Sequence, residues 1–132
     1  MDKVIKQLYF PSDVRYSTEH IWLKSERLIY RAGITDYARE QIGEIVYLDL
    51  PEVGEIFTKG EVFGSVESMQ TISELFMPLN AKIVEVNSSL LDEPEILNQD
   101  PYDDGWLIGI KVDEPIIGEY LLTHQEYINL LS

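Results

Sequence analysis

The 132-residue chain contains no cysteine, which excludes disulfide bonds, thiol catalysis and zinc sites built from thiolates. Basic side chains are also scarce: 10 lysines and arginines stand against 24 aspartates and glutamates, so the formal net charge is −14. A surface this acidic repels the phosphate backbone of nucleic acids, and we expect no nucleic-acid partner. The same charge is compatible with docking onto a basic partner and equally with a role in solubility alone.

Long apolar runs are absent as well. No stretch approaches the roughly 20 apolar residues that a membrane-spanning helix needs, so we expect no membrane association. The opening segment, MDKVIKQLYF, has neither the apolar core of a secretory signal nor the Arg- and Ser-rich composition of a transit peptide. We therefore expect a soluble, cytoplasmic protein.

The usual signatures of enzymes are missing too. The only two histidines, His20 and His124, lie far apart in the sequence. No serine lies in a nucleophile elbow, and no phosphate-binding glycine loop occurs. The neighbouring acids Asp103 and Asp104 have side chains suited to metal binding or acid–base catalysis, although adjacent acids in a loop usually face water. We predict a protein with no catalytic site and no bound metal.

Acidic residues gather in one part of the chain: Asp92, Glu93, Glu95, Asp100, Asp103 and Asp104. Two interpretations remain open for this cluster, a solvated loop region and a docking patch for a basic partner. A contact made through such a patch is expected to weaken with added salt, because the Debye length is about 10 Å at 0.1 M.

Short segments rich in β-branched and aromatic residues predict strands over residues 27–34, 44–50, 82–87 and 106–112. Few helices are expected. Thr35 has the character of an N-cap for a helix over residues 35–43, and Thr123 and Glu126 have the spacing of a capping box. Residues 88–94 predict a further helical turn. The pattern indicates an all-β dominated fold, a small sandwich or barrel with a few short peripheral helices, in a single domain over residues 1–132.

The segment GSVESMQTISE, residues 64–74, predicts a β-hairpin with Gln70 at its tip, between Met69 and Thr71. Strand alternation places alternate residues on opposite faces, with Val62, Gly64 and Val66 on one and Phe63, Ser65 and Glu67 on the other. Polar residues lie toward the tip and apolar ones toward the base. Such a hairpin presents its turn to solvent, although an ordinary polar turn is an alternative interpretation.

Six motifs follow one another along residues 16–131: YSTEHIW, GITDYAREQIGEIVYLDLPEVGE, KGEVFGSVESM, EVNSSL, NQDPYDDGWLI and EYINLL. In order and spacing they resemble the H protein family of the glycine cleavage system. The resemblance implies a lipoyl-domain-like fold, a flattened hybrid of barrel and sandwich made of two small antiparallel sheets with a few short helices. Residues 1–15 would then form an N-terminal extension.

The resemblance also implies a carrier rather than an enzyme. In that family a lipoyl arm is amide-linked to a lysine at the hairpin tip. The arm accepts an aminomethyl group from glycine decarboxylase and delivers it to an aminomethyltransferase, and dihydrolipoyl dehydrogenase then reoxidises it. These three enzymes and a lipoate ligase are the partners that the resemblance implies, and lipoate is the implied cofactor.

The hairpin tip departs from the family pattern. Where the family reads Glu-Ser-Val-Lys-Ala, this chain has Glu67, Ser68, Met69, Gln70 and Thr71, so Gln70 takes the lysine position. A lysine amine, with a pKa of about 10.4, has a lone pair that attacks an activated acyl group when deprotonated. The glutamine nitrogen has its lone pair delocalised into the carbonyl and is not a useful nucleophile. We therefore predict no lipoylation at Gln70 and no cofactor on this chain.

No other lysine is expected to substitute for the missing one. Lys59 and Lys82 flank the hairpin and are expected near its base, because a strand rises about 3.3 Å per residue.

Ile21 stands where the family has a glutamate, in the cleft region where the loaded arm docks, and it can neither hydrogen-bond nor carry charge. Glu67, Ser68 and Glu74 match the family pattern.

Two functional hypotheses follow from this mixture of retained and altered residues. The first is a carrier scaffold of the H-protein type that cannot be lipoylated at Gln70. The second is a non-carrier interaction or regulatory module, which keeps the docking surface for lipoyl-handling enzymes or for a different partner.

Overall fold

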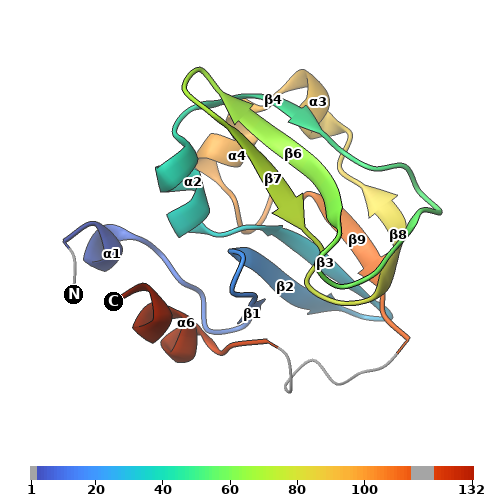
Figure 1. Cartoon of the computed structure of the whole chain (residues 1–132), viewed down its shortest axis with the longest axis horizontal. Coiled ribbons are helices and arrows are strands. Elements are labelled where there is room, and N and C mark those ends of the chain that lie inside the picture. Colours follow the sequence, from blue (N-terminus) through green and yellow to red (C-terminus); the bar gives the residue numbers. More distant parts are fainter. Residues whose placement is uncertain (1–2, 114–120) are drawn as a thin grey trace.

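Among residues 3–113 and 121–132, which the computed structural model describes, the strands form two antiparallel sheets. The strands are β1 (Arg15–Tyr16), β2 (Ile21–Glu26), β3 (Ile29–Ile34), β4 (Ile45–Asp49), β5 (Ile56–Phe57), β6 (Val62–Ser68), β7 (Ile72–Phe76), β8 (Ala81–Val86) and β9 (Ile108–Lys111). The larger sheet has the order β1-β2-β3-β9-β8-β5, and the smaller has the order β4-β6-β7. Figure 1 shows the smaller sheet lying over one face of the larger. The predicted fold class is confirmed.

The described helices are short and lie at the periphery (Figure 1). They are α1 (Lys3–Gln7), α2 (Asp36–Ile42), α3 (Ser89–Asp92), α4 (Glu95–Gln99) and α6 (His124–Leu131). The capping predictions are confirmed: the Thr35 hydroxyl accepts the Ala38 N–H at 3.2 Å, and Thr123 and Glu126 form a capping box. α3 coincides with the predicted helical turn, whereas α1 and α4 were not predicted. None of the helices in the described ranges is long and apolar enough to cross a bilayer.

Two strand predictions are corrected. The segment predicted as a strand from residue 27 begins as a turn, in which Arg27 has a φ of 61°, and the strand starts at Ile29. A β-bulge between Val62 and Gly64 shifts the register of β6 against β7. As a result Phe63 is buried and Val62 is exposed, the reverse of simple alternation.

The main core lies between the two sheets. Leu48 and Val66 from the smaller sheet and Ile83, Ile108 and Ile110 from the larger belong to one buried cluster. Because these side chains come from the inner faces of both sheets, their burial is what holds the sheets together.

A second, aromatic core attaches the C-terminal helix. Tyr16 and Tyr127 are both fully buried, and their rings stack with centroids 4.6 Å apart. The Tyr127 hydroxyl also lies 2.7 Å from His20 Nδ1 and 2.8 Å from Thr35 Oγ1. These contacts fix α6 against β1 and against the two segments that precede β2 and α2.

Candidate functional site

The hairpin tip is held by one buried hydroxyl. The Ser68 N–H donates to the Thr71 carbonyl at 2.9 Å, and the Ser68 Oγ accepts the N–H groups of Gln70 and Thr71, each at 3.2 Å. Ser68 is 5% exposed, whereas Met69 is 81% exposed. The turn is therefore fixed from inside while residues 69–71 face solvent.

Gln70 is placed at the tip, as predicted. Its side-chain oxygen lies 3.4 Å from the position that a Cβ on Gly43 would take. The side chain therefore extends toward Gly43, which is the C-cap residue of α2. Gly43 has a φ of 88°, which favours glycine there. Within the described residues the Gln70 side chain makes no hydrogen bond. What stands at the tip is an exposed amide.

A groove runs between α2 and β7, which is an edge strand of the smaller sheet. Its volume is about 250 Å³ and its lining includes Ile21, Tyr37, Gln41 and Glu74. The structure thus brings Ile21 and Glu74, two of the predicted site residues, to one groove. Ile21 is 1% exposed, so it contributes an apolar wall. Tyr37 and Gln41 were missed, although their spacing of four residues on a predicted helix indicates a shared face.

Glu67, a predicted site residue on β6, does not line this groove. Glu67 pairs with Tyr47 on one side and with Ile72 on the other. Directly opposed residues project to the same face of a sheet, and both Tyr47 and Ile72 are exposed. Glu67 therefore lies on the outer face of the smaller sheet, between two apolar side chains that the sequence analysis did not single out.

His20 lines the groove between α2 and β7 and contacts two aromatic residues. Besides its contact with the Tyr127 hydroxyl, its ring lies 4.9 Å from the ring of Tyr37. Burial lowers the pKa of His20 from its ordinary 6.5, and the negative charge of Glu19 opposes this effect. The neutral imidazole is thus the form that the folded protein favours.

The lowered pKa of His20 predicts a pH dependence of stability. Below about pH 6.5 the unfolded chain gains a proton at His20 that the folded chain resists, so the free energy of unfolding should fall as the pH falls through this range. Urea denaturation at several pH values between about 8 and 5.5 measures the effect. His20→Gln should reduce the pH slope relative to that of the native chain. Equal slopes for His20→Gln and the native chain would contradict the assignment.

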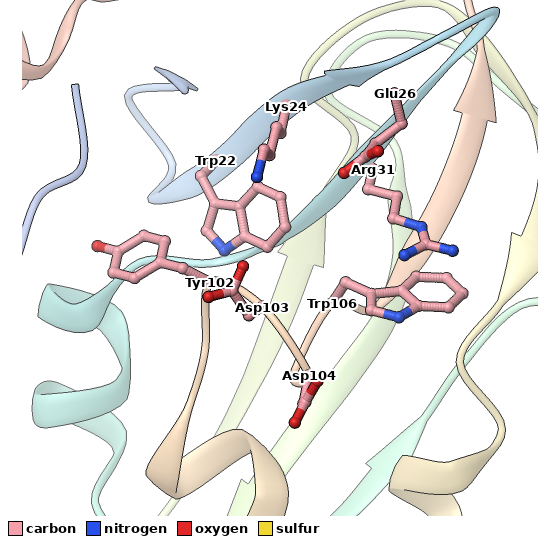
Figure 2. A pocket seen from close by; sticks show the side chains of 8 residues that line it. All are labelled: Trp22, Lys24, Glu26, Arg31, Tyr102, Asp103, Asp104 and Trp106. Atoms are coloured by element: carbon pink, nitrogen blue, oxygen red, sulfur yellow. The ribbon is translucent and has the colours of Figure 1, made fainter. Parts of the chain in front are cut away.

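A second hollow, of about 180 Å³, surrounds the paired acids Asp103 and Asp104. Figure 2 shows two indoles and several charged side chains around it, with the Arg31 guanidinium over the Trp106 ring, 4.1 Å from its centroid. No group of three or more His, Asp or Glu side chains suited to a metal ion occurs in residues 3–113 and 121–132. The Asp100 carboxylate accepts the N–H groups of Asp103 and Asp104, at 3.3 and 3.1 Å. The Asp100 carboxylate therefore stabilises the turn that contains Asp103 and Asp104.

The remaining acidic residues of the cluster lie on the short helices α3 and α4 or, for Glu93, in the connection between them. Asp92, Glu93 and Glu95 are exposed, while Leu90 and Leu97 of the same segments are fully buried. This exposed position suits both interpretations left open by the sequence, a solvated surface and a docking patch.

The two lysines that flank the hairpin lie near its base, as predicted. Lys82 belongs to β8, where it pairs with Ile56 of β5. Lys59 precedes Gly60, whose N–H donates to the Met77 carbonyl just beyond the end of β7. Neither lysine lies in the strands that carry the tip.

Comparison with known proteins agrees with the fold and with the motifs. The family model "Glycine cleavage H-protein" matches residues 14–132. The chain is 47% identical over 118 residues to a glycine cleavage system H protein of Bacteroides thetaiotaomicron, covering 89% of this chain and 94% of the relative. It is 43% identical over 122 residues to one of Listeria monocytogenes, covering 92% of this chain and 98% of the relative.

A solved structure gives the same result. The crystal structure of a glycine cleavage system H protein from Mycobacterium marinum superimposes with a TM-score of 0.79 at 38% sequence identity, covering 90% of this chain and 96% of that chain. The matched family model, the relatives and the shared fold agree, and the chain belongs to the glycine cleavage H-protein family.

Proposed function

We propose that this chain is an H-protein scaffold of the glycine cleavage system that carries no lipoyl group at residue 70. H proteins of this family are lipoate carriers that work with the enzymes of the glycine cleavage system. The observation that carries the proposal is that Gln70 stands at the exposed tip of the β6–β7 hairpin. We infer that this tip is the place where the family has its lipoyl-lysine. A carboxamide offers hydrogen bonds but no nucleophilic nitrogen.

The residues present do not fit the attachment of lipoate. Forming the amide link needs a free amine, and residues 62–76, which form the hairpin and its tip, contain no lysine. The groove beside α2 also does not fit a lipoyl arm, because the buried Ile21 that lines it offers neither a charge nor a hydrogen bond. We infer that the scaffold keeps Glu67, Ser68 and Glu74 but has lost the chemistry that they surround.

The other assignments follow from the family. We propose a cytoplasmic, single-domain protein without its own catalytic site. Its candidate partners are glycine decarboxylase, the aminomethyltransferase, dihydrolipoyl dehydrogenase and a lipoate ligase. Nucleic acid and membranes are not among them, because the net charge of −14 opposes contact with phosphate groups.

Intact-protein mass spectrometry tests the proposal. The native chain is incubated with a lipoate ligase, ATP and lipoate, beside the Bacteroides thetaiotaomicron H protein as a modified reference. We expect the mass of the native chain to stay unchanged. A gain of one lipoyl group would overturn the proposal, and peptide mapping would then identify the modified residue.

A second candidate function is a non-carrier interaction or regulatory module. The observation that favours it is the apolar character of the hairpin end, where Met69 and Ile72 are both exposed beside Gln70. A tip that serves only to carry an arm has no need of such side chains, whereas a protein-binding tip uses them.

A further inference from the structure

Three large apolar side chains are exposed together at the end of the smaller sheet. Tyr47 is 59% exposed, Ile72 is 64% exposed and Met69 is 81% exposed. Tyr47 and Ile72 are the two neighbours of Glu67 across the sheet, so they share one row on the outer face. Met69 follows β6 directly at the tip. We call the outer side of β4, β6 and β7, together with this tip, the outer face.

The charges on the outer face are all of one sign. Tyr47, Glu67 and Ile72 form one row across the three strands. Two residues farther from the tip, a second row on the same face is formed by Asp49, Ser65 and Glu74. The three strands contain no lysine or arginine. Carboxylates at Asp49, Glu67 and Glu74 thus alternate with exposed apolar groups, and no cation on these strands neutralises them.

The outer face continues into a shallow groove of about 470 Å³ toward the base of the sheet. Its lining combines the apolar side chains of Phe57 and Val62 with the carboxylates of Asp49, Glu52 and Glu55, and includes no basic residue. The apolar and acidic character of the tip therefore extends along the sheet rather than ending at the hairpin.

This charge pattern selects the kind of occupant. A second copy of the chain would bring the same row of carboxylates against itself across a two-fold axis, in a molecule whose net charge is −14. Like charges placed across an interface oppose binding. A surface with apolar side chains among lysines or arginines would bury Tyr47 and Ile72 and pair the carboxylates.

We propose that the outer face is the docking surface for a protein partner that presents apolar side chains flanked by lysines and arginines. The proposal rests on the function proposed above, because a tip without a lipoyl arm leaves Met69 and its neighbours available for direct contact. Tyr47 and Ile72 supply the apolar contact, while Glu67, Glu74 and Asp49 select the basic partner and set its register.

The test uses a peptide of alternating leucine and lysine as the probe, titrated into the isotope-labelled full chain and followed by NMR. Two control peptides replace either the lysines by glutamine or the leucines by serine. We expect amide shifts concentrated on β4, β6 and β7, and weaker binding for each control peptide. Tyr47→Ser combined with Ile72→Ser should weaken binding about tenfold, since both variants remove apolar area from the contact.

A matched variant shows whether the weaker peptide binding depends on the outer face or on the loss of any exposed apolar side chain. Leu28→Ser removes a leucine that is 93% exposed and lies in the turn between β2 and β3, and it should leave binding unchanged. Added salt should weaken binding of the lysine peptide more than that of the glutamine peptide.

Other outcomes would overturn the proposal. Shifts confined to residues 92–104 would move the docking site to the acidic cluster, and an unchanged affinity for the double variant would remove Tyr47 and Ile72 from the contact. A dimer in sedimentation that the double variant abolishes would assign the face to a second copy of the chain. The mass spectrum of the same sample reports lipoylation separately, so failure of the docking surface and failure of the proposed function are distinguishable.

Discussion

Replacing Gln70 by lysine is expected to create a site for a single lipoyl group, whereas the native chain is expected to accept none. The tip that would hold the lysine is already formed, because Ser68 binds the N–H groups of Gln70 and Thr71 from inside the hairpin. The side chain at residue 70 is exposed, so a longer side chain with a free amine can extend into solvent without repacking. Intact-protein mass spectrometry after treatment with lipoate ligase measures the gain.

A neighbouring variant makes this prediction specific to one position. Met69→Lys places an amine one residue earlier, at a site that is 81% exposed, and it should be modified far less than Gln70→Lys. Modification of both variants to the same extent would mean that the ligase needs only an exposed lysine on the tip. Modification of neither would mean that the surface recognised by the ligase has changed, and would favour the interaction-module hypothesis.

Replacing Trp22 by alanine is expected to cost about 3–5 kcal/mol of folding free energy, the usual range for removing a large buried aromatic side chain. Trp22 is 1% exposed, and its indole N–H donates to the Pro101 carbonyl at 2.9 Å. Its ring packs so closely on β3 that a Cβ added to Gly33 would lie 2.8 Å from it. The variant leaves a cavity and an unpaired carbonyl, and urea denaturation measures the loss.

Trp106→Ala is the matched control. Trp106 is only partly buried, and its ring packs under the Arg31 guanidinium at the surface (Figure 2). A cation–π contact at such a site contributes about 0.5–1 kcal/mol, so this variant should lose clearly less stability than Trp22→Ala. Equal losses would contradict the expectation that the buried indole of Trp22 contributes more to stability than the partly exposed indole of Trp106.

Features set by short-range hydrogen bonding could be predicted from the sequence. Thr35 and Thr123 cap their helices because a hydroxyl at that position binds an N–H only two or three residues away. The tip at Gln70 was placed correctly for a similar reason, since its turn is closed by contacts among residues 68–71.

Features that depend on distant residues could not be predicted in this way. The stacking of Tyr16 on Tyr127 joins residues from opposite ends of the chain, and neither local pattern contains a sign of it. The bulge that exchanges Val62 and Phe63 is a property of the pairing of β6 with β7, so alternation within one strand cannot reveal it.

Part of the candidate site was predicted from the family resemblance rather than from local hydrogen bonding. Ile21 and Glu74 were singled out through the resemblance to the H-protein family, and their shared groove lies between two elements that are far apart in the sequence. Tyr47 and Ile72 were missed, because an apolar side chain in a strand is ordinarily assigned to the core. Only the pairing of three strands places both on the outer face.

The Thr35 hydroxyl serves two elements at once. It accepts the Ala38 N–H at the start of α2 and contacts the Tyr127 hydroxyl of α6, and the residue is fully buried. Among the other amino acids only serine has a hydroxyl on the same atom. Serine is therefore the substitution at residue 35 that is expected to keep both contacts. A valine, which matches threonine in shape, would uncap the helix beside the groove and at the same time remove one of the contacts that hold the C-terminal helix.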